Sequence, residues 1–442
     1  MSAPTVLFGL NPLILSTVIL LLVYGALIAD TINRAIVSLL GACIMIISGI
    51  LTQDMATKAI DANTIGLLTG MMILVSISRR SGLFQYLAIL SARHANASPW
   101  GILLILQLTT AALSALLDNV TTVLLIVPVT LAITRALNVP AYPFLFAEIF
   151  ASNIGGTATL IGDPPNILIG SLVNLSFNAF VVHLTPIILV IMAVQAVIIH
   201  FMWGRELHAT PEARARIMAL TAADEIEDKI LLKQSLFVIG FVILGFVFAR
   251  QINLEPGTIA MLGATVLMLL DNWEHHSEKQ AENVHKTFTD VEWITIFFFI
   301  GLFITVYGVE VGGLLHWLAD HLIAATGGQL AQTGYAILWA SAILSAIIDN
   351  IPFVATMIPL VKDMAPALGG TAQIEPLWWC LSLGACLGGN GTLIGASANL
   401  TVAGIAEREG IRFNFWTYAK TAFPLMLVSI AISHVYVWWR YF

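Results

Sequence analysis

Acidic and amide side chains occur inside long apolar stretches of this sequence. Asp118-Asn119 and Asp349-Asn350 each lie in the middle of an apolar run, and Asp163 follows a glycine-rich segment. A carboxylate near the centre of a bilayer costs about 2.5–3.5 kcal/mol on insertion scales, so residues of this kind usually have a function. We therefore expect Asp118, Asp163 and Asp349 to carry a proton or to bind another coupling ion.

The strongest local pattern is the run from Ser152 to Asn166, which places three glycines and two prolines in an apolar stretch. Glycine and proline interrupt a helix, and freed backbone groups are tolerated in a membrane only beside a cavity. A packing kink is the alternative, because glycines let helices approach closely. The predicted substrate-binding residues of this run, its counterpart and the two Asp-Asn pairs are Asn119, Thr121, Gly155, Gly156, Thr157, Thr159, Asn166, Asn350, Gly388, Gly389, Asn390, Thr392 and Asn399.

The three acidic residues also have structural alternatives. An Asp at a helix start accepts hydrogen bonds from the first backbone amides, so Asp118 and Asp349 could cap the returning helix of a hairpin. Asp163 could cap a half-helix that starts at Pro164. It has no acidic counterpart in the second half of the chain, where Ala396 occupies the related position.

Patterns typical of metal sites are weak. Cys43, Cys380 and Cys386 form no C-x-x-C pair, and the histidines at 275, 276 and 285 lie in a hydrophilic stretch of mixed charge. We expect no metal site built from Cys or His. We also expect no cofactor, only a proton or sodium as the coupling ion.

The composition defines the class of protein. The chain of 442 residues is 58% apolar and only 10% charged, against about 25% charged residues in soluble domains. Its mean hydropathy is +0.91. These values exclude a soluble enzyme, a nucleic-acid-binding protein and a disordered chain. Because lipid requires backbone polar groups to be satisfied internally, we expect an all-α polytopic membrane protein.

The two halves of the sequence are related. A shift of 231 residues places Asp118-Asn119 on Asp349-Asn350, and a shift of 233 aligns 155–166 with 388–399 at seven identities in twelve positions. We expect inverted-topology repeats, each with one re-entrant hairpin and one unwound helix, and about ten transmembrane helices in all. The expected boundaries are 1–203 for the first repeat (hairpin 99–137, broken helix 143–176), 204–234 for a cytoplasmic linker, and 235–442 for the second repeat (hairpin 333–362, broken helix 376–405).

Basic residues predict the orientation. Lys and Arg concentrate in the loops that would be cytoplasmic if the N-terminus lay outside. The positive-inside rule then places both termini outside, in a multi-pass protein of the inner (plasma) membrane.

The run from Ser152 to Asn166, together with Leu117 to Thr122, resembles the arsenite/antimonite permease (ArsB) and NhaD-type antiporter branch of the ion transporter superfamily. The likeness covers essentially the whole chain, which is also similar to the melanosomal P protein. This resemblance implies a secondary active transporter and not an enzyme. It implies that hairpin tips meet unwound helices at a central substrate site, which moves against a scaffold.

Proton-coupled efflux of arsenite or antimonite is the favoured function. Arsenite is neutral near physiological pH, and hydroxyl, amide and carboxyl groups could bind it. A sodium/proton antiporter of the NhaD type is the alternative, since the same oxygens suit a hard cation. A dicarboxylate transporter is less expected, because acidic tips would repel its substrate. An intramembrane aspartyl protease is also less expected, since Asp163 follows Leu160-Ile161-Gly162 and such enzymes use a Gly-x-Gly-Asp motif.

The expected partners follow from this function. They are a small inorganic solute, protons and the lipid bilayer, and no nucleic acid. A homodimer and a soluble ATPase that docks on the 204–234 loop both stay open.

Overall fold

The computed structural model describes residues 6, 9–29, 31–219 and 221–442, and all regular secondary structure in these ranges is helical. The predicted all-α fold is confirmed. The first half contains α1 (Pro12–Ala29), α2 (Arg34–Ile47), α3 (Gln53–Ala59), α4 (Ala62–Arg79), α5 (Leu83–His94), α6 (Pro99–Ser114), α7 (Asn119–Leu137), α8 (Tyr142–Thr157), α9 (Pro164–Val173), α10 (Phe177–Ile199) and α11 (Pro211–Ala219). The second half contains α12 (Lys229–Phe248), α13 (Pro256–Asn272), α14 (Ser277–Thr289), α15 (Trp293–Gly312), α16 (Leu314–Ala325), α17 (Leu330–Ser345), α18 (Asn350–Met364), α19 (Glu375–Gly388), α20 (Ser397–Arg408) and α21 (Phe415–Tyr441).

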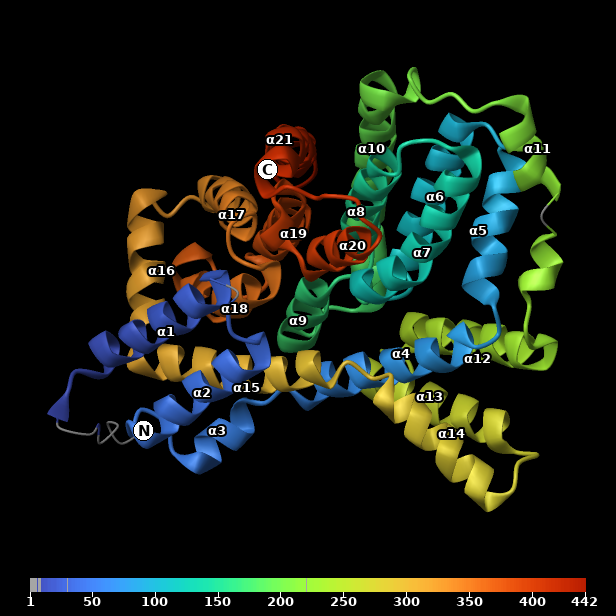
Figure 1. Cartoon of the computed structure of the whole chain (residues 1–442). Helices are drawn as coiled ribbons and strands as arrows, with labels where there is room; N and C mark the ends of the chain where they lie inside the picture. Colours follow the sequence, from blue (N-terminus) through green and yellow to red (C-terminus); the bar gives the residue numbers. More distant parts are fainter. Residues whose placement is uncertain (1–5, 7–8, 30, 220) are drawn as a thin grey trace.

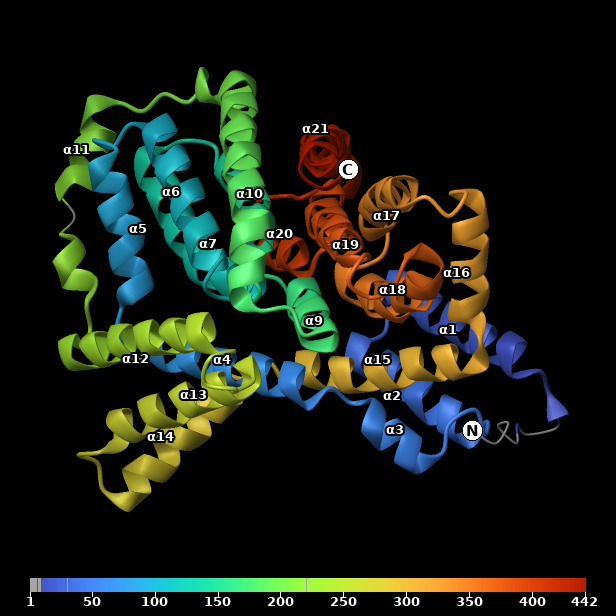
Figure 2. The same ribbon diagram turned by 180° about the vertical axis from the view of Figure 1, so that it is seen from behind.

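The helices form two layers. Helices α1 to α4 and α12 to α15 lie along one side of the molecule, here called the scaffold layer (Figure 1). Helices α5 to α10 and α16 to α21 lie on the other side, here called the site layer, and the view from behind shows the same division (Figure 2). Each layer therefore takes helices from both halves of the chain.

Close backbone approach holds the scaffold layer together. Helix α4 packs along α13, and α15 packs along α2. A Cβ on Gly70 would lie 2.6 Å from the Ala260 carbonyl carbon, and a Cβ on Gly301 would lie 2.5 Å from that of Ser38. Because Gly301 follows Gly70 by the 231-residue shift, the two contacts are equivalent and relate the two halves. Glycine is needed at both crossings, since any side chain would push the helices apart.

Eight described helices are long and apolar enough to cross a bilayer: α1, α4, α7, α10 with its π-helical extension, α12, α15, α18 with its 3₁₀ extension, and α21. This set differs in part from the predicted crossings. Two apolar runs counted among the roughly ten expected crossings, 35–51 and 257–271, form the shorter helices α2, of 14 residues, and α13, of 17 residues. Helix α2 stops early because Gly49 has a left-handed φ of +79°, which turns the chain.

Helices α7 and α18 are the second arms of two hairpins. The α6–α7 hairpin turns at 115–118, and the α17–α18 hairpin turns at 346–349. Each hairpin packs on a helix that is interrupted in the middle of its path, α8–α9 or α19–α20. The site layer thus contains the two hairpins and the two unwound helices that the sequence predicts.

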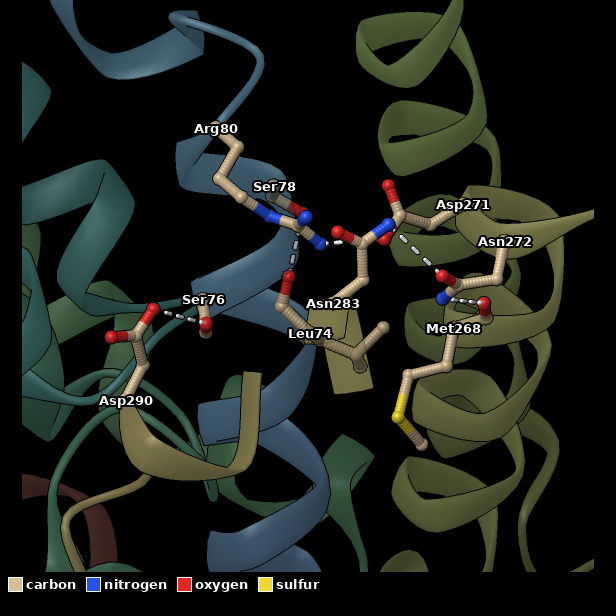
Figure 3. Close-up of polar contacts among 9 residues, drawn as sticks. All are labelled: Leu74, Ser76, Ser78, Arg80, Met268, Asp271, Asn272, Asn283 and Asp290. Atoms are coloured by element: carbon tan, nitrogen blue, oxygen red, sulfur yellow. Dashed lines mark hydrogen bonds and ion pairs between the residues drawn. The ribbon is translucent and has the colours of Figure 1, made fainter. Parts of the chain in front are cut away.

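A polar cluster fastens one end of the scaffold layer (Figure 3). At the end of α4, an Arg80 Nη atom lies 2.6 Å from Asp271 Oδ2 of α13. Ser76 Oγ of α4 donates to Asp290 Oδ2 at the end of α14, at 2.9 Å. Asn283 Nδ2 of α14 donates to Asn272 Oδ1 of α13 at 3.1 Å. These bonds tie three helices with side chains that are mostly shielded from solvent.

Candidate functional site

Both hairpin tips end in an aspartate that caps the returning helix. Asp118 Oδ1 accepts from the Thr121 backbone N–H at 2.8 Å, and its Oδ2 accepts from Thr121 Oγ1 at 2.5 Å. Asp349 Oδ1 accepts from the Ile351 N–H at 3.0 Å. The structural role considered for these two residues is therefore present. Thr121, predicted to bind substrate, serves this cap.

Each unwound helix is held open by an asparagine. Between α8 and α9, Asn166 Nδ2 donates to the Thr157 and Thr159 carbonyls at 3.1 and 2.9 Å. Between α19 and α20, Asn399 Nδ2 donates to the carbonyls of Gly389 and Thr392, at 2.8 Å each. The two asparagines satisfy carbonyls that lost their helical partners.

Each hairpin is clasped to its own unwound helix by two hydroxyl groups. In the first half, Ser114 Oγ donates to the Ser152 carbonyl at 2.7 Å, and Thr159 Oγ1 donates to the Ala115 carbonyl at 2.5 Å. In the second half, Ser345 Oγ donates to the Ala385 carbonyl and Thr392 Oγ1 to the Ala346 carbonyl. The positions match under the two repeat shifts, so both halves build the same clasp.

Glycines allow this close approach. A Cβ on Gly155 would lie 2.3 Å from the Ala111 carbonyl oxygen, and a Cβ on Gly388 would lie 2.6 Å from that of Ala342. A Cβ on Gly156 would lie 2.6 Å from the Gly162 carbonyl oxygen, inside the break. These predicted substrate-binding glycines thus pack against backbone. Gly389 repeats this contact less tightly, because a Cβ there would lie 3.1 Å from the Gly395 carbonyl oxygen and 3.6 Å from Asn350 Nδ2.

The two tips meet at Asp163. Asn119 Nδ2 donates to Asp163 Oδ1 at 3.1 Å, and Asn350 Nδ2 approaches the same oxygen at 3.4 Å. Asp163 is fully buried, and its Oδ2 has no hydrogen-bond partner among the described residues. Although it precedes α9, its side chain makes no capping hydrogen bond. The capping alternative for Asp163 is therefore wrong, and the carboxylate faces the tips.

A chain of amides links the two unwound helices across the site. Asn153 Oδ1 accepts from Asn119 at 3.3 Å, and Asn153 Nδ2 donates to Asn390 Oδ1 and to Asn399 Oδ1, each at 2.9 Å. Asn390 Nδ2 is buried without a partner among the described residues. The network thus holds an unpartnered acceptor, on Asp163, and an unpartnered donor, on Asn390. A hydroxyl group can satisfy either atom.

A cavity of about 20 Å³ lies at this meeting point, enough for roughly one water molecule. Its lining includes Asp118, Asn119, Asp163 and Asn350 from the site layer. The scaffold layer contributes Arg34, Leu68, Met72, Glu292 and Thr295. Among the described residues, no three His, Cys, Asp or Glu side chains converge closely enough to hold a metal ion.

A larger cavity of about 270 Å³ lies next to it. Arg34 and Ser397 line both cavities, so they stand between the small cavity and the larger one. The wall of the larger cavity is mostly apolar, with residues such as Phe298, and Asp349 is one of its polar lining residues. Its lining also includes Leu27, Ile28 and Asn33, from the end of α1 and the connection to α2.

Several residues at the site were not singled out from the sequence. Asn153 lies in the run from Ser152 to Asn166, but its role as the central link between the two unwound helices depends on tertiary structure. The shift of 233 that relates the breaks pairs Asn153 with Cys386, which lies 3.6 Å from Asn166 Oδ1. Ser382 Oγ donates to the same oxygen at 2.6 Å. That shift was the signal that could have identified Cys386, which is buried at the centre.

The relatives of this chain are transporters. A family model described as "Citrate transporter" (CitMHS) matches residues 19–384. An uncharacterized transporter of Mycobacterium bovis is 39% identical over 433 residues, which cover 97% of this chain and 99% of the relative. The human P protein is 33% identical over 516 aligned positions, covering 96% of this chain and 60% of that protein. The likeness to the P protein expected from the sequence is confirmed.

Solved structures share the fold at low sequence identity. The YdaH transporter of Alcanivorax borkumensis, described as having an unusual topology, matches with a TM-score of 0.58 at 14% identity, over 97% of this chain and 98% of that one. MtrF of Neisseria gonorrhoeae, from a class of antimetabolite efflux pumps, matches with a TM-score of 0.55 at 11% identity, over 97% and 95%. The arsenite-specific branch is not singled out by any of these matches. The sequence match over most of the chain and the shared fold establish that this protein is a multi-pass membrane transporter that belongs to the CitMHS family.

Proposed function

We propose that this protein is a secondary active transporter that couples protons to the movement of a small uncharged hydroxylated solute, with arsenite or antimonite as the candidate. The observation that carries the proposal is the position of Asp163. Its one oxygen lies within reach of both tip amides, and its other oxygen has no partner among the described residues. A buried carboxylate in this position is suited to carry a proton, and a change in its charge would alter its hydrogen bonds to both hairpins.

The charges around the small cavity disfavour an anionic solute. Asp118, Asp163 and Glu292 line it, against one basic residue, Arg34, among the described residues. A polyanion such as the citrate of the family description would meet net repulsion there. A solute with hydroxyl groups can donate to Asp163 Oδ2 and accept from an amide such as Asn390 Nδ2.

Sodium/proton antiport is the second candidate. The unpartnered Asp163 oxygen, together with carbonyls of the unwound helices, offers the hard oxygen ligands that a sodium ion needs. The candidate is weakened because, among the described residues, no three Asp, Glu, His or Cys side chains lie close enough together to hold a metal ion. It would require additional oxygen ligands from backbone or from the solute.

The orientation that basic residues predict is compatible with export. The larger cavity lies beside the α1–α2 connection, which that orientation places on the cytoplasmic side. We infer an inner-membrane protein with both termini outside, in a state whose site faces the cytoplasm. Such a state would load solute for export.

Transport in proteoliposomes tests the proposal. Purified protein is reconstituted and challenged with arsenite, antimonite, sodium or citrate, with and without an imposed proton gradient. We expect arsenite or antimonite uptake that requires the gradient, is unaffected by sodium and is lost in Asp163→Asn. Sodium-induced proton movement in the absence of arsenite would support the second candidate. Gradient-driven citrate uptake would overturn the argument from charge.

A further inference from the structure

Arg34 is the first residue of α2 and connects the two layers. One Nη atom donates to Ser397 Oγ of α20, at 2.5 Å, and the other donates to Thr295 Oγ1 of α15, at 2.8 Å. The guanidinium also lies over the Phe298 ring of α15, 5.6 Å from its centroid. A cation at a helix N-terminus is opposed by the helix dipole, so it requires acceptors of this kind.

Both hydroxyls that accept a hydrogen bond from Arg34 also donate a hydrogen bond to a carboxylate. Ser397 Oγ donates to Asp349 Oδ2 at 3.0 Å, and Thr295 Oγ1 donates to Glu292 Oε2 at 3.1 Å. Arg34 is therefore joined through one hydroxyl to the tip of the second hairpin and through the other to the scaffold layer. Hydrogen bonds that involve ionised groups are roughly twice as strong as neutral ones.

The related position in the second half of the chain has no basic residue. Because Gly301 packs on Ser38 and Gly70 on Ala260, a shift of 222 relates α2 to α13 and places Pro256 at the position of Arg34. A contact between the two layers within the first half, which does not occupy the repeat-related position, uses neutral donors. Asn63 Nδ2 donates to Ser171 Oγ of α9 at 2.8 Å, and that hydroxyl donates to Asp61 Oδ1 at 2.7 Å. Of these two contacts between the layers, the one at Arg34 depends on a cation.

We propose that Arg34 is a charge-sensitive latch, a positioning residue that holds α20 and the second hairpin tip against the scaffold layer while Asp349 is ionised. Neutralisation of Asp349 weakens the Asp349–Ser397–Arg34 chain and frees the site layer to move. Charged groups near Asp349 include Arg34 of α2, which lines the same cavity, and Asp163 before α9, which interacts with it electrostatically. Asp118 before α7 and Glu292 before α15 line the adjoining small cavity with Arg34 and Asp163. This inference rests on the proposed coupled transport and describes how the empty carrier is kept from moving.

Hydrogen–deuterium exchange in lipid nanodiscs, without any solute, tests the latch. In Arg34→Gln we expect the amides of 397–408 to exchange about tenfold faster than in the unmodified protein. Asp349→Asn and Ser397→Ala should do the same, and Arg34→Gln combined with Asp349→Asn should add nothing, because all three break one chain. Arg34→Lys keeps the charge and should retain most of the protection, which guards against simple misfolding.

The control is Ser171→Ala, which breaks the neutral contact between the layers in the first half. It should speed exchange in α9 and leave 397–408 unchanged. Unchanged exchange of 397–408 in Arg34→Gln, or additive effects of Arg34→Gln and Asp349→Asn, would overturn the latch. Because this readout needs no substrate, a failed latch with intact gradient-driven transport, or the reverse, separates this inference from the proposed function.

Discussion

Asn119 and Asn350, which lie 231 residues apart in the sequence, both point their side-chain amides at one carboxylate oxygen, Asp163 Oδ1. Each asparagine is the first residue of the returning arm of a hairpin. A change in the charge of Asp163 therefore alters the hydrogen bonds of both hairpin tips at the same time. This relationship is the basis of the first two predictions.

Asp163→Asn should abolish coupling and leave a folded protein. The amide is nearly the same size as the carboxylate but cannot carry an exchangeable charge, so we expect gradient-driven uptake to fall at least about tenfold. Uptake in proteoliposomes and the thermal midpoint give the two readouts. Asp224→Asn, at an exposed position outside the site, is the matched control and should behave like the unmodified protein. Full coupling in Asp163→Asn would remove this residue from the mechanism.

Asn119→Ala and Asn350→Ala should weaken substrate binding to a similar degree. Each removes one neutral donor from the site, and the loss of one such hydrogen bond corresponds to an affinity about 3–10-fold lower. Concentration dependence of uptake, or thermal stabilisation by the solute, measures this effect. If one variant binds normally while the other does not, the solute contacts only one hairpin.

Gly155→Ala and Gly388→Ala should destabilise the hairpins. The new methyl groups would lie 2.3 and 2.6 Å from the carbonyl oxygens of Ala111 and Ala342, and overpacking of this kind costs about 1–3 kcal/mol. Gly404→Ala in α20 is the control, because nothing lies within 4 Å of its Cβ. Thermal unfolding should rank Gly404→Ala as neutral or stabilising. An equal loss of stability in all three variants would contradict the proposed packing.

Asp271→Ala should lower stability through the scaffold layer. It leaves Arg80 without its ion-pair partner, in a setting where both side chains are largely shielded, at 23% and 10% exposure. Hydrogen bonds to charged groups contribute about 1.5–3 kcal/mol. Asp54→Ala breaks an exposed pair with Lys58, which should cost less than about 1 kcal/mol. Comparable losses in the two variants would show that the Arg80 pair behaves as a surface pair.

Much of the architecture is accessible from the sequence, because lipid allows few backbone arrangements. The internal shifts of 231 and 233 residues identify the hairpins, the broken helices and the Asp-Asn tips without any structure. Helix lengths were less accessible. Apolar residues continue past the end of α2, and only the backbone turn at Gly49 shows where the helix stops.

The site was only partly predictable. Polar residues inside apolar runs pointed to Asp163 and both tip asparagines, which the structure brings together. Roles within the site depend on which way each side chain faces, and hydropathy does not report this. Thr159 and Asn166 were expected at the substrate, but the Thr159 hydroxyl donates to the hairpin backbone at Ala115 and the Asn166 amide donates to the broken backbone. Arg34 is distant in sequence from both motifs, so its place beside Ser397 followed from tertiary packing alone.

The hydroxyl clasps between hairpins and unwound helices determine which substitutions these positions can tolerate. In all four, the acceptor is a main-chain oxygen, at Ala115, Ser152, Ala346 and Ala385. Mutation at an acceptor position therefore leaves the oxygen in place, and the two halves already differ there, with Ser152 opposite Ala385. Removal of a donor hydroxyl therefore breaks one of these joints, whereas a change of side chain at an acceptor residue leaves its carbonyl oxygen available.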